Sequence, residues 1–158
     1  MSIKSILAIS LVYLSVLTLT VSAQSRDMDP DVKSYKLSME KIKAYDVVAH
    51  KLMAVDASDP SFKGTLSQIG TQKTLNGMVG AVEANPKLLA IIKSGNLSAR
   101  EFCVIPMGVM AAGGAYMIQT QYKKDASNLA TPENIAFYEK NKADIDRIAS
   151  TWAGPSQR

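Results

Sequence analysis

The feature that most constrains this fold is an uncharged run that extends from Phe102 to Tyr122. Ser98 and Glu101 precede it with the S-x-x-E spacing of a helix capping box, so a helix is predicted from Ala99 to about Tyr122. A helix of that length measures roughly 36 Å. Because it is apolar on nearly every side, we expect other helices to cover most of its surface.

Several residues in this run oppose helix formation. Pro106 removes one backbone hydrogen bond and predicts a kink at its position. Gly108, Gly113 and Gly114 each lower helix propensity by about 1 kcal/mol relative to alanine. Tertiary packing has to offset these penalties. We therefore predict that segment 102–118 is mostly buried and that the first and last long helices flank it.

The sulfur-containing residues Cys103, Met107, Met110 and Met117 share one side of this predicted helix. Core filling is the favoured interpretation, because methionine adapts to irregular gaps and free cysteine is commonly buried. The alternative is a soft Cu(I) or haem-iron site. Cys103 is the only cysteine, which excludes an intramolecular disulfide. Its apolar surroundings favour a buried, unreactive thiol over pairing between chains.

A transmembrane helix is a second alternative for the same run. Its length would reach across a bilayer core. The small residues Gly108 and Ala112 have a spacing that also occurs where membrane helices touch. Gln119, Thr120 and Gln121 leave about 17 apolar or small residues, which is the lower limit for a span. We therefore favour the core helix of a bundle.

Residues 1–23 have the three parts of a secretory signal peptide. Lys4 provides the positive start, an apolar core follows as far as Leu19, and small residues end at Ala23. We predict cleavage between Ala23 and Gln24 and a periplasmic or secreted bacterial protein. An uncleaved N-terminal anchor is the alternative.

The chain after this predicted cleavage site forms one domain by length. We predict a flexible N-terminal tail at 24–37, a single helical-bundle domain at 38–154 and a C-terminal tail at 155–158. Removal of Lys4 takes the 18 Lys and Arg residues to 17, against 14 Asp and Glu. These charges are interspersed, so no basic block of the kind that binds nucleic acid is present.

Periodicity and capping signals predict four further helices. They extend from Met39 to about Asp56, from Thr71 or Thr74 to about Ala84, from Lys87 to Ser94 after an Asn85-Pro86 start, and from Thr131-Pro132 to about Ala153; one or two helical turns are also expected in 61–69. No strand pattern is found in the sequence. The predicted fold is all-α, a small helical bundle of four to five helices around a central, kinked apolar helix.

Two polar residues, His50 and Asn141, are candidate site residues. His50, the only histidine, lies off the apolar face of its predicted helix, four residues after Asp46. This spacing predicts a solvated surface pair of the two side chains. The alternative is a haem or metal ligand opposite a methionine, although the absence of C-x-x-C-H excludes covalent c-type haem. Asn141 falls on the inner stripe of the last helix. A boundary residue bonded to a carbonyl or water is favoured there over a buried polar group.

Three segments carry a resemblance: LSMEKIKAY at 37–45, NLSAREF at 96–102 and NIAFYEKNKADIDRI at 134–148. Together they resemble a group of uncharacterised secreted all-helical bacterial proteins. The resemblance implies a fold and an export signal only. It carries no activity and no catalytic residue to this chain.

The sequence contains none of the motifs that mark common catalytic sites, such as G-x-S-x-G, H-E-x-x-H or a phosphate-binding loop. We therefore predict a non-enzymatic binding or interaction module without a cofactor. Its expected partner is a protein or a small apolar ligand that enters a gap beside the methionines, with no nucleic acid and no stable membrane insertion. The alternative is a periplasmic haem- or copper-binding redox protein whose candidate ligands are His50 or the Cys103, Met107 and Met110 face.

Overall fold

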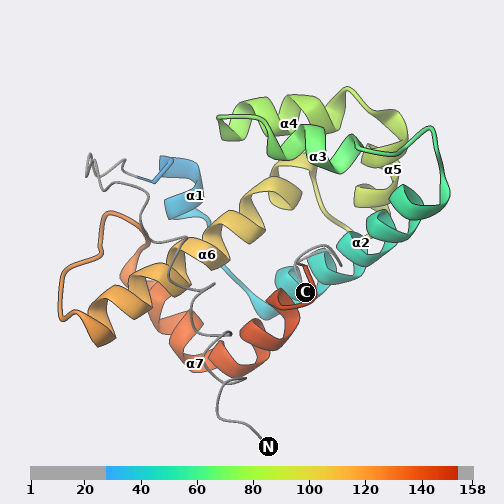
Figure 1. Cartoon of the computed structure of the whole chain (residues 1–158). Coiled ribbons are helices and arrows are strands. Elements are labelled where there is room, and N and C mark those ends of the chain that lie inside the picture. The colour runs from blue at the N-terminus through green and yellow to red at the C-terminus, as the bar shows by residue number, and fades with distance from the viewer. Residues whose placement is uncertain (1–27, 153–158) are drawn as a thin grey trace, which may run out of the picture.

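The computed structural model describes residues 28–152, which contain seven helices and no strands (Figure 1). The helices are α1 (Pro30–Ser34), α2 (Met39–Ser58), α3 (Thr65–Gly70), α4 (Leu75–Glu83), α5 (Pro86–Ser94), α6 (Ala99–Gln121) and α7 (Pro132–Ala149). The all-α prediction is confirmed. The count exceeds the predicted four to five because α1 and α3 span only five and six residues. The predicted signal peptide and the C-terminal tail at 155–158 lie outside the described residues.

Side-chain caps determine where the longer helices begin. Caps accept backbone N–H bonds at Ser38 for α2, Thr74 for α4, Asn85 for α5, Ser98 for α6 and Thr131 for α7. Each cap satisfies a donor that has no partner within its helix. Both bonds of the predicted capping box at the start of α6 are present.

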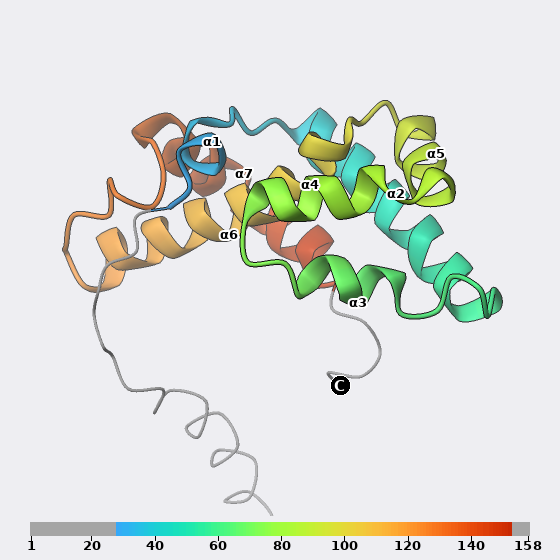
Figure 2. The same cartoon turned by 90° about the horizontal axis from the view of Figure 1, so that it is seen from above.

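The helix α6 lies at the centre of the fold, and Figures 1 and 2 show the other helices arranged around it. It packs against α1, α2, α4, α5 and α7, so the prediction that the first and last long helices flank it is confirmed. Gly108, Ala111 and Ala112 are buried, which supports the central-helix prediction. The helix continues through Pro106. A kink at this position stays a prediction.

Burial of α6 is nevertheless uneven, because Met110 is 72% exposed and Met117 is 45% exposed. The core-filling interpretation of the sulfur side is therefore wrong for these two residues, while Cys103 is buried as predicted. The helical wheel places the four sulfur residues on one side of α6. It does not show whether another helix covers that side along its full length.

Of the helices in 28–152, α6 alone is long and apolar enough to cross a membrane, with a mean hydropathy of 1.5. Half of the window that meets this criterion is buried within the fold. The core helix of a soluble protein has the same length and composition. Its five neighbouring helices fit that interpretation.

The N-terminal segment differs from its prediction. Residues 24–37 were expected to be flexible, yet 30–34 form α1, and Val32 and Leu37 are 1% and 3% exposed. A Cβ atom on Gly108 would lie 3.3 Å from Leu37 Cδ2, so the glycine allows this segment to approach α6 closely. The folded region therefore begins before the predicted boundary at residue 38.

An asparagine on α7 attaches this segment to the bundle. Asn134 is 4% exposed, and its Oδ1 accepts a hydrogen bond from Leu37 N at 3.1 Å. Its Nδ2 donates to Tyr35 O at 2.8 Å and to Lys33 O at 3.4 Å. The buried polar residue of α7 is thus Asn134. Asn141 is a boundary residue whose Nδ2 donates to the Phe137 carbonyl at 2.8 Å, as predicted.

Candidate functional site

Two hollows border α6 and share Met110 as a common wall residue. The first, which we call the cleft, has a volume of about 380 Å³. It is lined by Tyr45, Ala49, Leu52 and Met53 of α2, Leu66, Ile69 and Gly70 of α3, Met78 of α4, Phe102, Cys103, Pro106, Met107 and Met110 of α6, and Trp152. None of these side chains is charged. The volume falls in the range of small-molecule sites, roughly 300–1,000 Å³.

The cleft brings together sulfur residues from three helices. Cys103, Met107 and Met110, all predicted as candidates, line it along one side of α6. Met53 of α2 and Met78 of α4 join them. Sequence reasoning missed these two because a helical wheel relates residues of one helix only, and no local pattern indicates which methionines face each other across a bundle.

Aromatic side chains form another wall of the cleft. The ring of Tyr45 lies 5.2 Å from Phe102 and 4.7 Å from Trp152 between centroids, the second pair in an edge-on arrangement. Asp46 Oδ1 accepts hydrogen bonds from Trp152 Nε1 and Thr151 Oγ1, each at 3.0 Å. Burial raises the pKa of Tyr45 to about 12, so its phenol is neutral at physiological pH. The Asp46 carboxylate fixes the position of Trp152 but does not itself line the cleft, so the wall stays uncharged.

Cys103 lies deep in the cleft and is 4% exposed. Burial raises the pKa of its thiol to about 11, and Arg100 opposes this shift only in part. The thiol therefore stays protonated near neutral pH, and thiolate is the nucleophilic form of cysteine. The prediction of a buried thiol is confirmed.

The only histidine lies outside the cleft. His50 is exposed, and its Nδ1 lies 2.8 Å from the Asp46 carbonyl oxygen and 3.3 Å from Asp46 Oδ1. The predicted surface pair is confirmed. His50 does not line the hollow that holds Cys103, Met107 and Met110. The structure therefore separates the two sets of candidate metal ligands.

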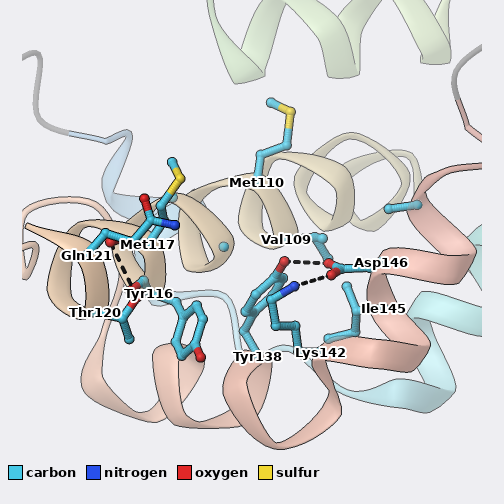
Figure 3. A pocket seen from close by; sticks show the side chains of 13 residues that line it. Val109, Met110, Tyr116, Met117, Thr120, Gln121, Tyr138, Lys142, Ile145 and Asp146 are labelled. Atoms are coloured by element: carbon cyan, nitrogen blue, oxygen red, sulfur yellow. Dashed lines mark hydrogen bonds and ion pairs between the residues drawn. The ribbon is translucent and has the colours of Figure 1, made fainter.

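The second hollow, which we call the groove, has a volume of about 530 Å³ and lies between the second half of α6 and α7 (Figure 3). It is lined by Val109, Met110, Gly113, Gly114, Tyr116, Met117, Thr120 and Gln121 of α6, and by Tyr138, Lys142, Ile145, Asp146 and Ala149 of α7. A Cβ atom on Gly113 would lie 3.0 Å from the Tyr138 ring, so this glycine allows α7 to approach.

Three polar side chains of the groove satisfy one another. Tyr138 Oη donates to Asp146 Oδ1 at 2.6 Å, and Lys142 pairs with Asp146 Oδ2. Figure 3 shows Tyr138 and Lys142 pointing toward Asp146, with Met110 pointing away from all three. The bonds from Lys142 and Tyr138 lower the pKa of the Asp146 carboxyl. Partial burial and then the bond to Asp146 raise the pKa of Tyr138 to about 12. Neither group is therefore poised to transfer a proton near neutral pH.

Usual metal ligands are dispersed in the part of the chain that the structure describes. Within 28–152, no three His, Cys, Asp or Glu side chains gather closely enough to hold a metal ion. The cleft is lined by methionines from three different helices.

No family model, curated protein or solved structure matches this chain. The resemblance to secreted helical bacterial proteins stays a prediction, and function is argued from the site itself.

Proposed function

We propose that this chain is an exported, non-catalytic binding protein that holds a small, uncharged, apolar molecule in the cleft. The observation that carries the proposal is a hollow of about 380 Å³ whose described walls, from four helices and Trp152, include no charged side chain. A hollow of this kind leaves apolar surface in contact with water. A ligand that covers it gains about 25 cal/mol for each Å² of apolar area removed from solvent.

The composition of the walls favours an uncharged ligand. The lining side chains offer no counter-ion, so a carboxylate or ammonium group inside the cleft would lose its hydration without a partner. Methionine side chains are flexible and polarisable and adapt to ligands of different shape. The ring of Trp152 is fixed by Asp46 and provides a flat apolar surface. These features suit a small ring or short chain without a charge.

Trp152 gives a direct test, because it is the only tryptophan and it lines the cleft. The purified protein is titrated with naphthalene and 1-aminoanthracene, and the emission of Trp152 is followed. We expect saturable quenching with a one-to-one stoichiometry. Absence of a saturable change with either probe would contradict the proposal.

Two glycines provide a matched pair of variants for this titration. A Cβ atom added at Gly70 or at Gly80 would meet no atom within 4 Å, but only Gly70 lines the cleft. Gly70→Phe adds a ring at a position that lines the cleft and should weaken probe binding at least tenfold. Gly80→Phe should leave binding unchanged. Equal binding by both variants would place the probe elsewhere.

The export part of the proposal has its own test. Protein expressed from the full sequence should be released by osmotic shock without detergent, and N-terminal sequencing should begin at Gln24. A cell-associated chain that retains residues 1–23 would overturn the export part. The cleft proposal would stand or fall separately on the probe titration.

A further inference from the structure

The wall of the cleft is unusually rich in sulfur. Four of the eight methionines of the chain line it, together with its only cysteine. Met53, Met78 and Met107 are half-buried, Cys103 is buried below them, and Met110 is exposed. The sulfur residues thus extend from solvent to the interior of one hollow.

Gap filling accounts for only part of this arrangement. Methionine commonly serves in cores because it fills irregular spaces. Met78 and Met107 do pack partly against the core, but all four methionines also line open space of about 380 Å³. Met110, which is 72% exposed, gains little from burial. Leucine or isoleucine would build an apolar wall with better-defined rotamers.

We infer that the cleft binds one Cu(I) ion through the thioether sulfurs of Met53, Met78 and Met107, with Met110 at the entrance. Thioether sulfur is a soft, uncharged ligand that suits Cu(I). The three proposed ligands come from α2, α4 and α6, so each helix contributes one. Because thioethers carry no proton, no ligand has to ionise before the ion binds.

The rest of the wall disfavours competing ions, because it offers a single thiol as their usual ligand. The side chains that line the cleft include no imidazole and no carboxylate. Zn²⁺ is held mainly by thiolate, imidazole and carboxylate ligands, and Ca²⁺ and Mg²⁺ by oxygen ligands. A monovalent ion also loses less hydration energy than a divalent ion on entering an uncharged hollow. The inference uses the same cleft as the proposed function but different chemistry.

The test uses the purified protein under anaerobic, reducing conditions. Cu(I) is supplied as its complex with bicinchoninate, and transfer to the protein is read from loss of the chelator colour. Ag(I), a soft ion without redox chemistry, is counted by native mass spectrometry. We expect one equivalent of either ion on the wild-type protein. Failure to take either ion would overturn the inference.

Leucine variants remove sulfur and preserve the apolar volume. Met53→Leu/Met78→Leu/Met107→Leu should weaken Cu(I) binding at least 100-fold, and each single variant at least tenfold. Met117→Leu is the matched control, because Met117 lies on the same helix but lines only the groove. It should bind Cu(I) as the wild type does. Undiminished binding by the triple variant would place the ion elsewhere and overturn the inference.

The naphthalene titration separates this inference from the proposed function. If the wild type binds the probe but not Cu(I), the copper inference alone fails. If it binds Cu(I) but no probe, the apolar-ligand proposal alone fails. If the triple variant does not fold, the three single variants decide.

Discussion

The cleft and the groove lie along the same helix and share Met110, yet their chemistry is opposite. The groove is the larger, at about 530 Å³ against 380 Å³. Its charged and phenolic groups are already paired with one another through Asp146. The lining of the cleft includes no charged side chain, and its aromatic and sulfur surface borders open space. The comparison teaches that the chemistry of the lining side chains indicates binding better than the volume of a hollow does.

The two hollows also differ in what surrounds them. Residues from α2, α3, α4 and α6, with Trp152, build the cleft, whereas the described lining of the groove comes from α6 and α7 alone. The cleft therefore rests on the core, with Leu52 fully buried in its floor. The groove also reaches the core through Val109 and Ile145, and its rim bears the exposed Met117. Mutations should distinguish the floor of the cleft from the rim of the groove.

The largest effect is expected from truncating the floor of the cleft. Leu52 is 0% exposed, so Leu52→Ala should lower the free energy of unfolding by about 2–5 kcal/mol through lost burial and a new cavity. Met117, 45% exposed in the groove, is the comparison. Met117→Ala should cost less than about 1 kcal/mol, as is usual for surface positions. Urea unfolding measures the free energy of unfolding of both variants. Equal decreases would contradict the different burial of Leu52 and Met117.

Two aspartates give the next contrast. Asp46 Oδ1 accepts the Trp152 and Thr151 bonds that fix one wall of the cleft. Asp46→Ala leaves the indole N–H without its partner and should cost about 1–3 kcal/mol. It should also weaken probe binding. Asp146→Ala removes an exposed ion pair of the groove, worth about 1 kcal/mol or less, together with the hydrogen bond from the Tyr138 hydroxyl. Probe binding should be unchanged in that variant. If Asp146→Ala weakened probe binding more than Asp46→Ala, the probe would be assigned to the groove and not to the cleft.

Adjacent glycines on α6 sharpen the description of the groove. A Cβ atom on Gly114 meets nothing within 4 Å, so Gly114→Ala should stabilise the helix by about 0.5–1 kcal/mol. At Gly113 the same atom would lie 3.0 Å from the Tyr138 ring. The gain in helix propensity is then offset by displacement of that ring. Thermal unfolding should rank Gly114→Ala above Gly113→Ala, and the opposite order would contradict the packing of Tyr138.

The smallest effect expected is a pH dependence with opposite sign at Tyr45 of the cleft and at Asp146 of the groove. Burial raises the pKa of Tyr45 from 10.0 to about 12, so the unfolded chain loses this proton first and stability falls as pH rises above 10. The pKa of Asp146 is lowered from 3.8, so its contribution is present above 3.8 and is lost as pH falls below that value.

Isosteric variants isolate these two contributions. Tyr45→Phe should flatten the alkaline limb of the stability curve and leave the acid limb unchanged. Asp146→Asn should flatten the acid limb, and it should change the alkaline limb only through Tyr138, whose raised pKa depends in part on Asp146. Urea unfolding across pH measures both curves. A Tyr45→Phe curve that matches the wild type above pH 10 would show that the phenol is not shielded in the folded state.

Much of the fold could be predicted because helix caps are local signals. Ser38, Asn85, Ser98 and Thr131 were each recognised from their own residue and its next few neighbours, and each caps a helix. Thr74 was one of two starts left open for α4. The short helix α1 was missed because five residues show no periodicity. The Asp29-Pro30 pair, now seen as its cap and first residue, was the available signal.

The site was less predictable because it depends on contacts between helices. Cys103, Met107 and Met110 could be placed together from their spacing on one helix. Their association with Met53 and Met78 depends on how α2 and α4 pack against α6, which no local pattern specifies. The exposure of Met110 could not be predicted for the same reason. An apolar helix predicts burial, but the arrangement of the neighbouring helices determines which of its residues they cover.

The most direct test of the central claim is to map one apolar probe onto both hollows at once. In ¹H–¹⁵N NMR spectra of the protein titrated with naphthalene, the account predicts saturable shifts of the Trp152 indole N–H and of the Gly70 and Cys103 amides. The Gly114 and Gln121 amides of the groove should remain unshifted. Shifts confined to Gly114 and Gln121 would contradict the account and assign binding to the groove.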